Sequence, residues 1–359
     1  MTILNETILH IDLNKLNENF NFLKSRLKSN TKIIGVVKAY AYGHGDIEIS
    51  KRLEKLGVYA LWVSDFEEGL ILRNSGVKTK IIVANPGVKS YDSIIKYKLD
   101  VVLYNQKLLD LYCSNTNTVN IHIKFNTGMN RYGFSSKSVD SIISKIKKHK
   151  HLKLDSICSH LAASEDKKKS NFTQNQIKKF NSISVRAEDL LGRKINKHIL
   201  NSYGLLNFSN YQMNYVRIGI GLYGSVDNLN LKQICSLKST ITQIRNIKKG
   251  ESVGYGGSFI ANQKMTIAII PVGYADGMNR QLGNRIGSVY VNNLECKIIG
   301  EISMDSFIVD ITKSNAKEGD LVEIFGENIN VCTIAKKINT IPYEIYSTLN
   351  RRIKRVYSY

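Results

Sequence analysis

The residue of this chain with the clearest capacity for chemistry is Lys38, which follows a short apolar segment. Residues 33–37 read IIGVV, a β-branched run that is typical of a buried parallel strand. A side chain directly after such a strand lies at the carboxyl edge of the sheet, where α/β proteins build active sites. Apolar neighbours disfavour an ammonium there, so the pKa of the lysine falls and its amine becomes available for Schiff-base chemistry with an aldehyde.

The segment that follows Lys38 favours this role over that of a solvated lysine, which is the commoner case for a single lysine at a strand end. Residues 38–45 read KAYAYGHG. A lysine followed by this aromatic, glycine-rich turn closely resembles the segment of the alanine racemases in which a lysine carries pyridoxal phosphate (PLP). The resemblance implies that Lys38 binds the coenzyme covalently and that Tyr42 offers a hydroxyl to its phosphate.

Composition limits the class of protein. The chain has 359 residues, 43% hydrophobic and 23% charged, which is typical of a globular protein with room for two domains. No apolar run reaches the roughly 18 residues of a membrane span, and the amino terminus lacks a signal-peptide pattern, so we expect a cytoplasmic protein without membrane attachment. The five cysteines are far apart and form no CxxC pair, so neither a disulfide framework nor a metal site is expected.

The formal net charge is +21, from 51 Lys and Arg against 30 Asp and Glu. Such an excess can attract nucleic acid or an anionic membrane. The basic residues are spread along the whole chain, however, and local clusters such as 145–153 (KIKKHKHLK) lack the interleaved aromatic residues of a single-strand binding surface. Solvated helix faces explain these clusters, and we expect no nucleic-acid partner.

Eight short apolar runs each predict a parallel strand. Helical patterns lie between many of these runs. One pattern follows Asp12, which is expected to cap the helix, and another covers 171–191. Eight strand–helix repeats within about 220 residues match the size of a (β/α)8 barrel. The runs lie near 33–37, 59–64, 80–84, 100–104, 119–125, 154–159, 197–201 and 215–218.

Beyond about residue 230 the pattern changes to alternating segments separated by glycines, which predicts an antiparallel β domain. The predicted fold is therefore α/β, with a (β/α)8 TIM-type barrel that binds PLP over 10–230 and a mainly antiparallel β domain over 231–359. Residues 1–9 are expected to add a strand to the second domain. The junction between the domains is placed near 225–232 only because the period of the hydrophobic pattern changes there.

Barrels commonly bind a phosphate through the loops after strands seven and eight. Residues 201–204 (NSYG) follow the seventh predicted strand and 216–224 (VRIGIGLYG) include the eighth and its loop, although each alone could be a simple turn. The second segment resembles the alanine racemase segment whose arginine faces the pyridine nitrogen of PLP. The resemblance implies the pyridine contact for Arg217, phosphate contacts from the backbone amides of Gly219 and Ile220, and phosphate hydroxyls from Ser202 and Tyr343.

An arginine beside the pyridine nitrogen has a mechanistic consequence. The permanent cation disfavours protonation of that nitrogen and weakens the ring as an electron sink. A carbanion at Cα is then brief and is reprotonated at the same carbon, which suits a racemase better than an aminotransferase. Without its neighbours in the sequence, Arg217 would more simply be interpreted as an ion-pair partner at the barrel rim.

Inversion of a stereocentre requires that a proton leaves one face and returns to the other, so two bases must flank Cα. Lys38 is one candidate. Residues 270–277 (IPVGYADG) resemble the racemase loop that supplies the opposite base from the partner subunit, which implies Tyr274 as that base and a homodimer with shared active sites. A free tyrosine has a pKa near 10. The resemblance assigns its support to His160, with Arg217 and His198 behind it, although a lone histidine such as His198 is more often structural.

Two further segments resemble the same family in the part that binds the substrate. In 124–131 (KFNTGMNR) the resemblance implies that Arg131 meets the substrate carboxylate and that a carboxylated Lys124 holds this arginine in place. Addition of CO2 turns a cationic lysine into an anion that can pair with the arginine. Asn126 stands where many members have Asp, and Tyr40 stands where Asn is commoner.

The second segment, 300–305 (GEISMD), resembles a partner-subunit loop. The backbone amide of Met304 is implied to bind the substrate carboxylate, with Asp305 as a supporting residue. The matched segments run in order from residue 36 to 344. Together they imply a PLP-dependent racemase that interconverts L-alanine and D-alanine and supplies D-alanine for peptidoglycan.

Three alternatives remain open at the level of the sequence. The first is a racemase for serine or another amino acid on the same fold. The second is a PLP-binding carrier without turnover. The presence of Tyr274 and Arg131 argues against it. The third is nucleic-acid binding through the net charge.

Overall fold

A computed structural model describes residues 6–226 and 230–359, which form two compact units. The barrel unit comprises Phe20–Ala41 and Asp46–Leu222. The β unit comprises the described part of Met1–Asn19, together with Tyr42–Gly45 and the described part of Tyr223–Tyr359. The predicted division at 230/231 stays a prediction, and three residues of the expected junction, 227–229, lie outside the described residues, as do residues 1–5 of the expected first strand.

The barrel unit contains an eight-stranded sheet in which every pair of neighbouring strands is parallel. Its order is β8-β7-β6-β5-β4-β3-β2-β9. The two ends of the sheet approach each other where Arg217 N of β9 donates at 3.0 Å to Leu200 O, two residues after β8, so the barrel is nearly closed and the predicted fold class is confirmed. The strands are β2 (Lys32–Val36), β3 (Ala60–Val63), β4 (Lys80–Val83), β5 (Asp100–Leu103), β6 (Val119–Lys124), β7 (Leu152–Cys158), β8 (Asn196–His198) and β9 (Tyr215–Ile218).

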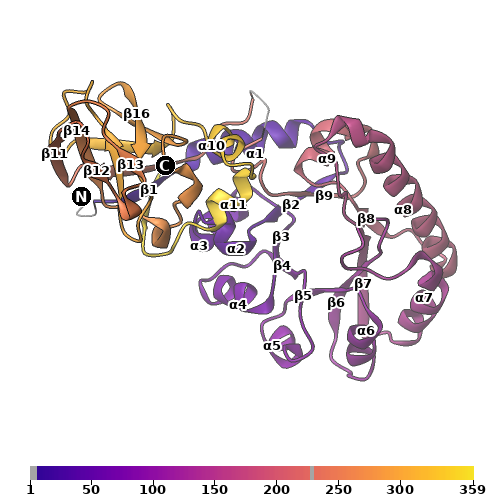
Figure 1. Ribbon diagram of the computed structural model, residues 1–359. Helices are drawn as coiled ribbons and strands as arrows, with labels where there is room; N and C mark the ends of the chain where they lie inside the picture. Colours follow the sequence, from indigo (N-terminus) through magenta and orange to yellow (C-terminus); the bar gives the residue numbers. More distant parts are fainter. Residues whose placement is uncertain (1–5, 227–229) are drawn as a thin grey trace. The chain divides into compact units, whose positions relative to one another are not determined.

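Helices separate the strands, and Figure 1 shows α4 to α8 on the outer side of the strands. Polar residues cap several of them, as expected for Asp12, whose Oδ1 accepts from Asn14 N and Lys15 N at the start of α1. Among the described residues, no helix is long and apolar enough to cross a membrane. The helices are α1 (Leu13–Ser25), α2 (Lys38–Tyr42), α3 (Asp46–Lys55), α4 (Phe66–Asn74), α5 (Tyr91–Lys96), α6 (Gln106–Cys113), α7 (Val139–Lys148), α8 (Ser170–Leu191) and α9 (Ser202–Asn207), with short 3-10 turns η1 (Ser136–Ser138), η2 (Lys167–Lys169) and η3 (Ser209–Tyr211).

The β unit contains a nine-stranded sheet in the order β11-β14-β17-β16-β15-β18-β10-β1-β19. All its pairs are antiparallel except the pair of β1 (Ile8–Asp12) with β19 (Lys354–Ser358). Leu9 and Ile11 of β1 are buried. The remaining strands are β10 (Cys235–Thr240), β11 (Gln243–Ile247), β14 (Met265–Ile270), β15 (Ser288–Val291), β16 (Leu294–Ile299), β17 (Phe307–Asp310) and β18 (Leu321–Phe325), with a separate pair β12 (Ser252–Val253) and β13 (Phe259–Ile260).

Short helices connect these strands and carry several of the predicted site residues. They are α10 (Val331–Lys337), α11 (Pro342–Ser347), η4 (Tyr255–Gly257), η5 (Tyr274–Asp276) and η6 (Arg280–Leu282). All five cysteines are free thiols, and all but Cys332 are buried.

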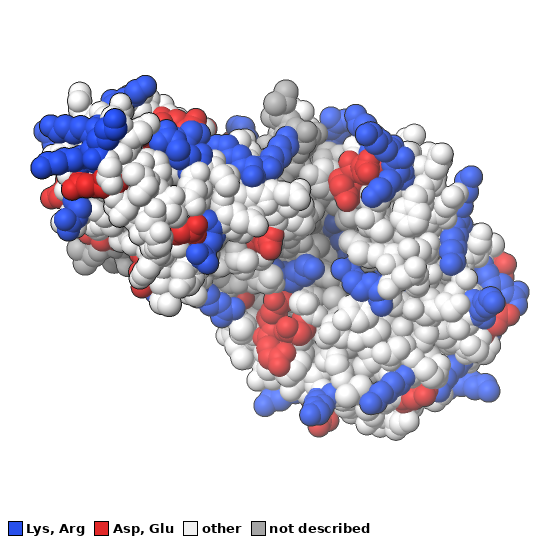
Figure 2. Space-filling model, viewed as in Figure 1, with Lys and Arg blue, Asp and Glu red and all other residues white. Residues whose placement is uncertain are grey.

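The positive charge is spread over the visible face of both units (Figure 2). Lys and Arg side chains are scattered over the barrel unit with uncharged surface between them, and another group lies over the part of the β unit that contains β11 and β14. This distribution agrees with the scatter of basic residues along the sequence.

Candidate active site

Lys38 lies just beyond the carboxyl end of β2 and begins an uncommon backbone segment. Residues 39–42 all have φ between 50° and 56°, so they form a turn of left-handed helix without glycine. This conformation costs on the order of 1–2 kcal/mol per L-residue. Strain of this kind concentrates at functional sites, where the surrounding structure enforces it. The turn therefore singles out the region of Lys38 as a candidate site.

The glycine that follows the left-handed turn is required by a close contact. Gly43 has φ 83°, and a Cβ there would lie 2.0 Å from the carbonyl oxygen of Tyr346. The Tyr42 ring lies 4.9 Å from the Tyr223 ring and 5.6 Å from the Tyr343 ring, measured between centroids. Burial raises the pKa of the Tyr42 phenol, which therefore keeps its proton as a hydrogen-bond donor. The β unit thus brings together the two tyrosines predicted to bind phosphate.

Glu68 in α4 holds the backbone directly after Lys38. Its Oε1 accepts from Ala39 N at 2.6 Å and its Oε2 accepts from Ser64 N, in the loop after β3, at 2.7 Å. Burial raises the pKa of Glu68, although these two hydrogen bonds oppose that shift. The carboxylate therefore links the loops after two neighbouring strands and fixes the start of the strained turn. The sequence analysis did not identify this residue.

Replacement of Glu68 by glutamine is expected to destabilise the barrel unit by about 1–3 kcal/mol, because the amide places an N–H₂ group opposite one of two backbone donors. Chemical denaturation monitored by circular dichroism measures the loss. Hydrogen exchange at the amides of Ala39 and Ser64 should accelerate with it. The exposed neighbour Glu67→Gln is the matched control and should change neither measurement.

The charges of Lys38, Arg131 and Arg217 all act on Lys124, so these four side chains form a cationic cluster in the barrel unit. Burial, followed by the charge of Arg131, lowers the pKa of the Lys38 amine. The pKa of Lys124 is lowered to about 8, chiefly by burial, and the charges of Arg217, Arg131 and Lys38 contribute to this shift. Such a concentration of positive charge suits an anionic ligand, and both amines lose their protons more readily than a solvated lysine does.

Arg217 at the end of β9 is 5% exposed and is held by neutral acceptors rather than by a carboxylate. One terminal nitrogen donates to His198 Nδ1; the other donates to Ser159 O at 2.6 Å and to His160 Nδ1 at 3.0 Å. The guanidinium carbon also lies 5.3 Å from the centre of the Trp62 ring. Among the described residues nothing accepts a hydrogen bond from Nε, so this donor remains available to a ligand acceptor.

His160 and His198 are both kept neutral by their surroundings. Burial, followed by the charge of Arg217, lowers the pKa of each ring well below its usual range. Both use Nδ1 as an acceptor for Arg217, which fixes the orientation of both rings. The structure therefore joins the three residues that the sequence grouped into one supporting network.

Ser202, Gly219 and Ile220 lie together at the ends of β8 and β9. The buried Ser202 Oγ accepts from Gly219 N at 3.1 Å and from Gly221 N at 3.2 Å. Asn201 Oδ1 accepts from Gly204 N and so caps α9. The backbone N–H of Ile220, a residue that is 1% exposed, has no hydrogen-bond partner in the described part of the chain. An unpartnered buried amide beside a serine hydroxyl suits a phosphate oxygen.

The segment that contains Lys124 and Arg131 is held by an asparagine. Asn126 Oδ1 accepts from Gly128 N at 3.0 Å and from Asn130 N at 3.1 Å, and its amide nitrogen donates to Asn130 Oδ1 at 2.9 Å. This residue therefore shapes the loop that ends at the exposed Arg131. Among the described residues, no carboxylate pairs with Lys124 Nζ, which lies 5.8 Å from the centre of the Tyr132 ring.

In the β unit, the loops that carry Tyr274 and Met304 are joined through their backbones. Tyr274 N donates to Ser303 O, and Ala275 N donates to Met304 O, both at 3.0 Å. Gly273 is required at this junction because a Cβ there would lie 2.1 Å from Met304 O. Tyr274 is 43% exposed and Met304 is 54% exposed, so both predicted residues lie on the surface of the β unit.

Arg352 holds the same two loops from the other side. Its guanidinium donates twice to Asp276, at 2.6 and 3.0 Å, and once to Asp305 at 2.7 Å. Asp276 also accepts from Gly273 N at 2.8 Å. Asp305, for which a supporting role is predicted, accepts from this guanidinium, whereas Arg352 itself was missed by the sequence analysis.

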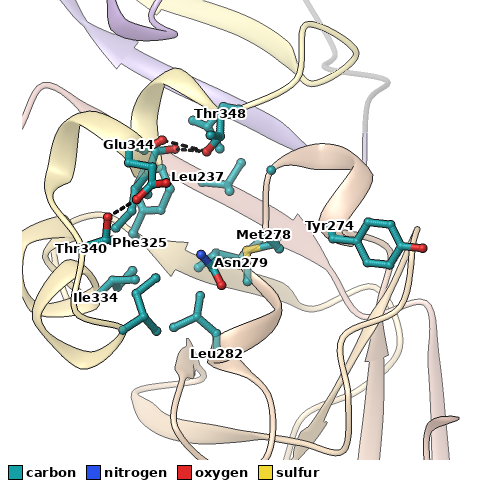
Figure 3. A pocket seen from close by; sticks show the side chains of 15 residues that line it. Leu237, Tyr274, Met278, Asn279, Leu282, Phe325, Ile334, Thr340, Glu344 and Thr348 are labelled. Carbon is teal, nitrogen blue, oxygen red and sulfur yellow. Dashed lines mark hydrogen bonds between the residues drawn. The ribbon is translucent and has the colours of Figure 1, made fainter.

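A cavity of about 230 Å³ in the β unit has a different character. Figure 3 shows apolar side chains such as Met278 and Phe325 facing it, whereas the Tyr274 ring points away from the other labelled residues. Its lining contains no lysine or arginine, and its one charged residue is Glu344. A carboxylate or phosphate would be repelled there, so this cavity is not the site predicted for substrate or coenzyme.

The geometry defines a class of protein: a (β/α)8 barrel with a lysine of lowered pKa among cationic groups and a loop suited to a phosphate, together with a β domain. The chain matches the family model for the alanine racemase N-terminal domain over residues 11–227 and that for the alanine racemase C-terminal domain over residues 234–357. The chain therefore belongs to the alanine racemase family, whose members are PLP-dependent isomerases.

Individual relatives agree with this assignment over their whole length. An alanine racemase of Helicobacter pylori strain Shi470 is 35% identical, with 98% of each chain covered. The structure of an alanine racemase from Clostridium difficile 630 has a TM-score of 0.92 at 32% identity and covers 99% of this chain and 97% of its own. An alanine racemase from Bartonella henselae, whose structure contains covalently bound PLP, has a TM-score of 0.90 at 30% identity and covers 99% of this chain and all of its own.

Proposed function

We propose that this racemase interconverts L-alanine and D-alanine, with PLP bound covalently to Lys38. The observation that carries the proposal is the amine of Lys38, which has a lowered pKa, begins a strained turn and belongs to a cationic cluster with Lys124, Arg131 and Arg217. A neutral amine is the form that condenses with an aldehyde, and the cations suit both a phosphate and a substrate carboxylate. Family membership supports the same reaction.

Several residues of the chain suit the parts of PLP. The Ser202 hydroxyl and the amides of Gly219 and Ile220 would hold the phosphate, with the Tyr42 and Tyr343 hydroxyls as further donors. Arg217 Nε, which has no partner among the described residues, would donate to the pyridine nitrogen, and His160 would support the ring. When bound, PLP withdraws electrons from Cα of the attached amino acid and so makes its proton removable.

Two side chains of this chain would move the Cα proton in the proposed mechanism. The Lys38 amine serves one face of the substrate, and Tyr274 of the partner subunit serves the other, so the protein would act as a homodimer with shared active sites. The exposure of Tyr274 and Met304 on joined loops supports their use by a second copy. Arg217, kept cationic among neutral acceptors, would prevent the pyridine nitrogen from taking a proton and so favour racemisation over transamination.

Arg131 and the backbone amide of Met304 would hold the substrate carboxylate. A carboxylated Lys124 would pair with Arg131, which is a change of charge that relieves the repulsion within the cationic cluster. The pKa of about 8 supports this modification, because a neutral amine is required to add CO2.

Replacement of Lys124 by methionine offers a test of this modification through stability. The folded pKa of about 8 is below the ordinary lysine value of 10.5, so the buried ammonium destabilises the unmodified fold fully below pH 8, and its cost disappears as the pH rises from 8 to 10.5. In CO2-free buffer at pH 7 the variant is therefore expected to be more stable by about 1–3 kcal/mol, with the gain fading above pH 8. Denaturation curves between pH 6 and 10.5 measure it.

Added bicarbonate should reverse the sign of this difference, because the carboxylated lysine of the parent protein then forms an ion pair that methionine cannot form. Lys137→Met, at an exposed lysine, is the control and should respond to neither pH nor bicarbonate. A stability difference that is the same with and without bicarbonate would show that Lys124 remains an amine.

Polarimetry of L-alanine with and without added PLP tests reaction, substrate and coenzyme together. We expect loss of optical rotation that depends on PLP. A panel of L-amino acids assayed for the D-product separates alanine from serine or a longer side chain. The physiological role would be the supply of D-alanine for peptidoglycan by a cytoplasmic enzyme, and an enzyme that turns over serine faster than alanine would contradict this assignment.

A further inference from the structure

A chain of buried polar side chains runs from Arg217 to two carboxylates inside the barrel. His198 Nε2 lies 3.0 Å from Ser156 Oγ, which in turn lies 2.6 Å from His122 Nδ1. His122 Nε2 faces Asp100 Oδ2 at 3.8 Å and Asp155 Oδ2 at 3.9 Å. The two histidines and Ser156 are fully buried. Family resemblance assigned a role only to the first two members of this chain, Arg217 and His198.

An irregularity of the sheet places two consecutive residues of β7 in this chain. Ile121 is paired with Leu154, but the next residue, His122, is paired with Ser156, so Asp155 is an extra residue on β7. A bulge of this kind redirects side chains relative to the regular alternation. Asp155 accepts hydrogen bonds from Tyr59, which precedes β3, and from Asn196 in β8, so its carboxylate, which is 12% exposed, lies where side chains from distant strands meet.

Between Arg217 and His122 Nδ1, only one arrangement of the hydrogens gives every donor an acceptor. An arginine can only donate, so His198 Nδ1 must accept from Arg217, and the neutral His198 ring carries its hydrogen on Nε2. Ser156 Oγ accepts this hydrogen and gives its own to His122 Nδ1. His122 then carries its hydrogen on Nε2, directed at the two carboxylates. Any other arrangement leaves a buried hydroxyl hydrogen without an acceptor or sets two donors against each other.

The end of the chain has unsatisfied groups that fit this direction. Asp100 Oδ2 and His122 Nε2 are buried and have no hydrogen-bond partner among the described residues. Asp100 is anchored on its other oxygen, which accepts from Asn120 Nδ2 at 3.0 Å. A shift of less than 1 Å would bring the Nε2 hydrogen into a bond with either carboxylate.

We propose that Asp100 and Asp155 are positioning residues of the racemase: by attracting the His122 Nε2 hydrogen they stabilise, from the far end, the direction of hydrogen bonding that Arg217 requires of His198. The proposal rests on the proposed function in one respect, the contact of Arg217 with the coenzyme. If the carboxylates are lost, His122 is free to move its hydrogen to Nδ1, and Ser156 then turns its own hydrogen toward His198. His198 would have to present a hydrogen to Arg217, which would displace the guanidinium.

A cation bound by Asp100, His122 and Asp155 is the competing explanation, since their ligand atoms all lie within 4.8 Å of one another. A metal ion would occupy His122 Nε2 and move the ring hydrogen to Nδ1. Ser156 would then receive hydrogens from both histidines and lose the acceptor for its own. The contact of Arg217 with His198 therefore favours the hydrogen-bonded arrangement over the metal.

Nitrogen NMR of the full-length protein, labelled with ¹⁵N-histidine and measured with and without PLP, tests the proposal directly. We expect both His122 and His198 to carry hydrogen on Nε2. Asp100→Asn, nearly isosteric, should shift His198 toward the Nδ1-protonated form and lower kcat about 10-fold with little change in KM, which corresponds to about 1.4 kcal/mol. Asp140→Asn, which removes a carboxylate from the exposed ion pair with Arg186, is the control and should leave both unchanged.

Ser156 provides a second, independent variant. Ser156→Ala should uncouple His198 from substitutions at Asp100, whereas Ser156→Thr keeps the hydroxyl and should restore the coupling. Unchanged His198 signals in Asp100→Asn would overturn the proposal. So would loss of the His122 Nε2 hydrogen on addition of Zn²⁺ at micromolar concentration. Because the histidine signals are read without substrate, an enzyme inactive on alanine would refute the proposed function but not the hydrogen-bond chain.

Discussion

Lys38→Ala is expected to abolish both the absorbance of bound PLP and the racemisation of alanine, with a loss of at least about 10⁴-fold in kcat. The substitution removes the covalent attachment of the coenzyme and one of the two bases at once. Absorbance spectra of the purified protein after dialysis against PLP measure the first effect, and polarimetry measures the second.

Lys32→Ala is the matched control, because Lys32 is exposed at the opposite end of the same strand. It should retain both signals. A Lys38→Ala protein that keeps the absorbance band would show that another amine holds the coenzyme. Lys124, the other amine of lowered pKa in the cationic cluster, would then be the first candidate.

Tyr274→Phe is expected to affect the two directions of the reaction unequally. The phenyl ring retains the shape of the loop but removes one base, so Cα proton exchange should fall about 10²- to 10⁴-fold from L-alanine and far less from D-alanine. Proton NMR in D₂O follows the exchange at Cα for each enantiomer separately. Tyr255→Phe, at a tyrosine of the same unit that is 75% exposed, should leave both rates unchanged. Equal losses from both enantiomers would contradict a mechanism with two distinct bases.

A mixture of the Lys38→Ala and Tyr274→Phe proteins separates shared sites from sites within one chain. If Tyr274 serves the partner's Lys38, each mixed dimer has one intact site and one site that lacks both groups. Dissociation and reassociation of equal amounts should then restore about a quarter of the parent activity, since about half of the dimers are mixed. Sites built from a single chain would give no recovery.

The barrel could be predicted from the sequence because each of its strands is an apolar, β-branched run between helical patterns. The clearest difference is β8, expected near 197–201 but ending at His198. Ile199 and Leu200 are buried, as the pattern requires, but Asn201 already caps α9, so the chain leaves the regular ladder. Burial determines which residues are apolar, whereas the extent of a strand depends on hydrogen bonds that hydrophobicity does not encode.

The residues of the site could be predicted from the sequence only where a residue type is distinctive in its segment. Lys38, Arg131 and Arg217 stand in segments whose types and order resemble a known family. Glu68 and Arg352 could not be found from such segments, because each acts through hydrogen bonds to parts of the chain that are remote in sequence. For Glu68 the one available signal was Asp65 three residues earlier, a capping pattern that indicates a helix start rather than a contact with residue 39.

The left-handed turn was also not predicted, since Ala and Tyr at 39–42 give no indication of positive φ. Only the glycine after the turn is a local signal. It indicates a tight turn, but it does not indicate that the preceding residues form a left-handed helix. Backbone strain enforced by surrounding contacts is therefore the part of this site that the sequence conceals most completely.

The pairing of β1 with β19 has a consequence for biosynthesis. Ile8 of β1 is made 346 residues before Lys354, its partner in β19. At 5–20 residues per second the edge of β1 that pairs with β19 therefore waits roughly 20 to 70 s for its partner. During translation the nascent chain should therefore bind chaperones through its amino-terminal segment, and truncation before residue 354 should leave that segment exposed to proteases.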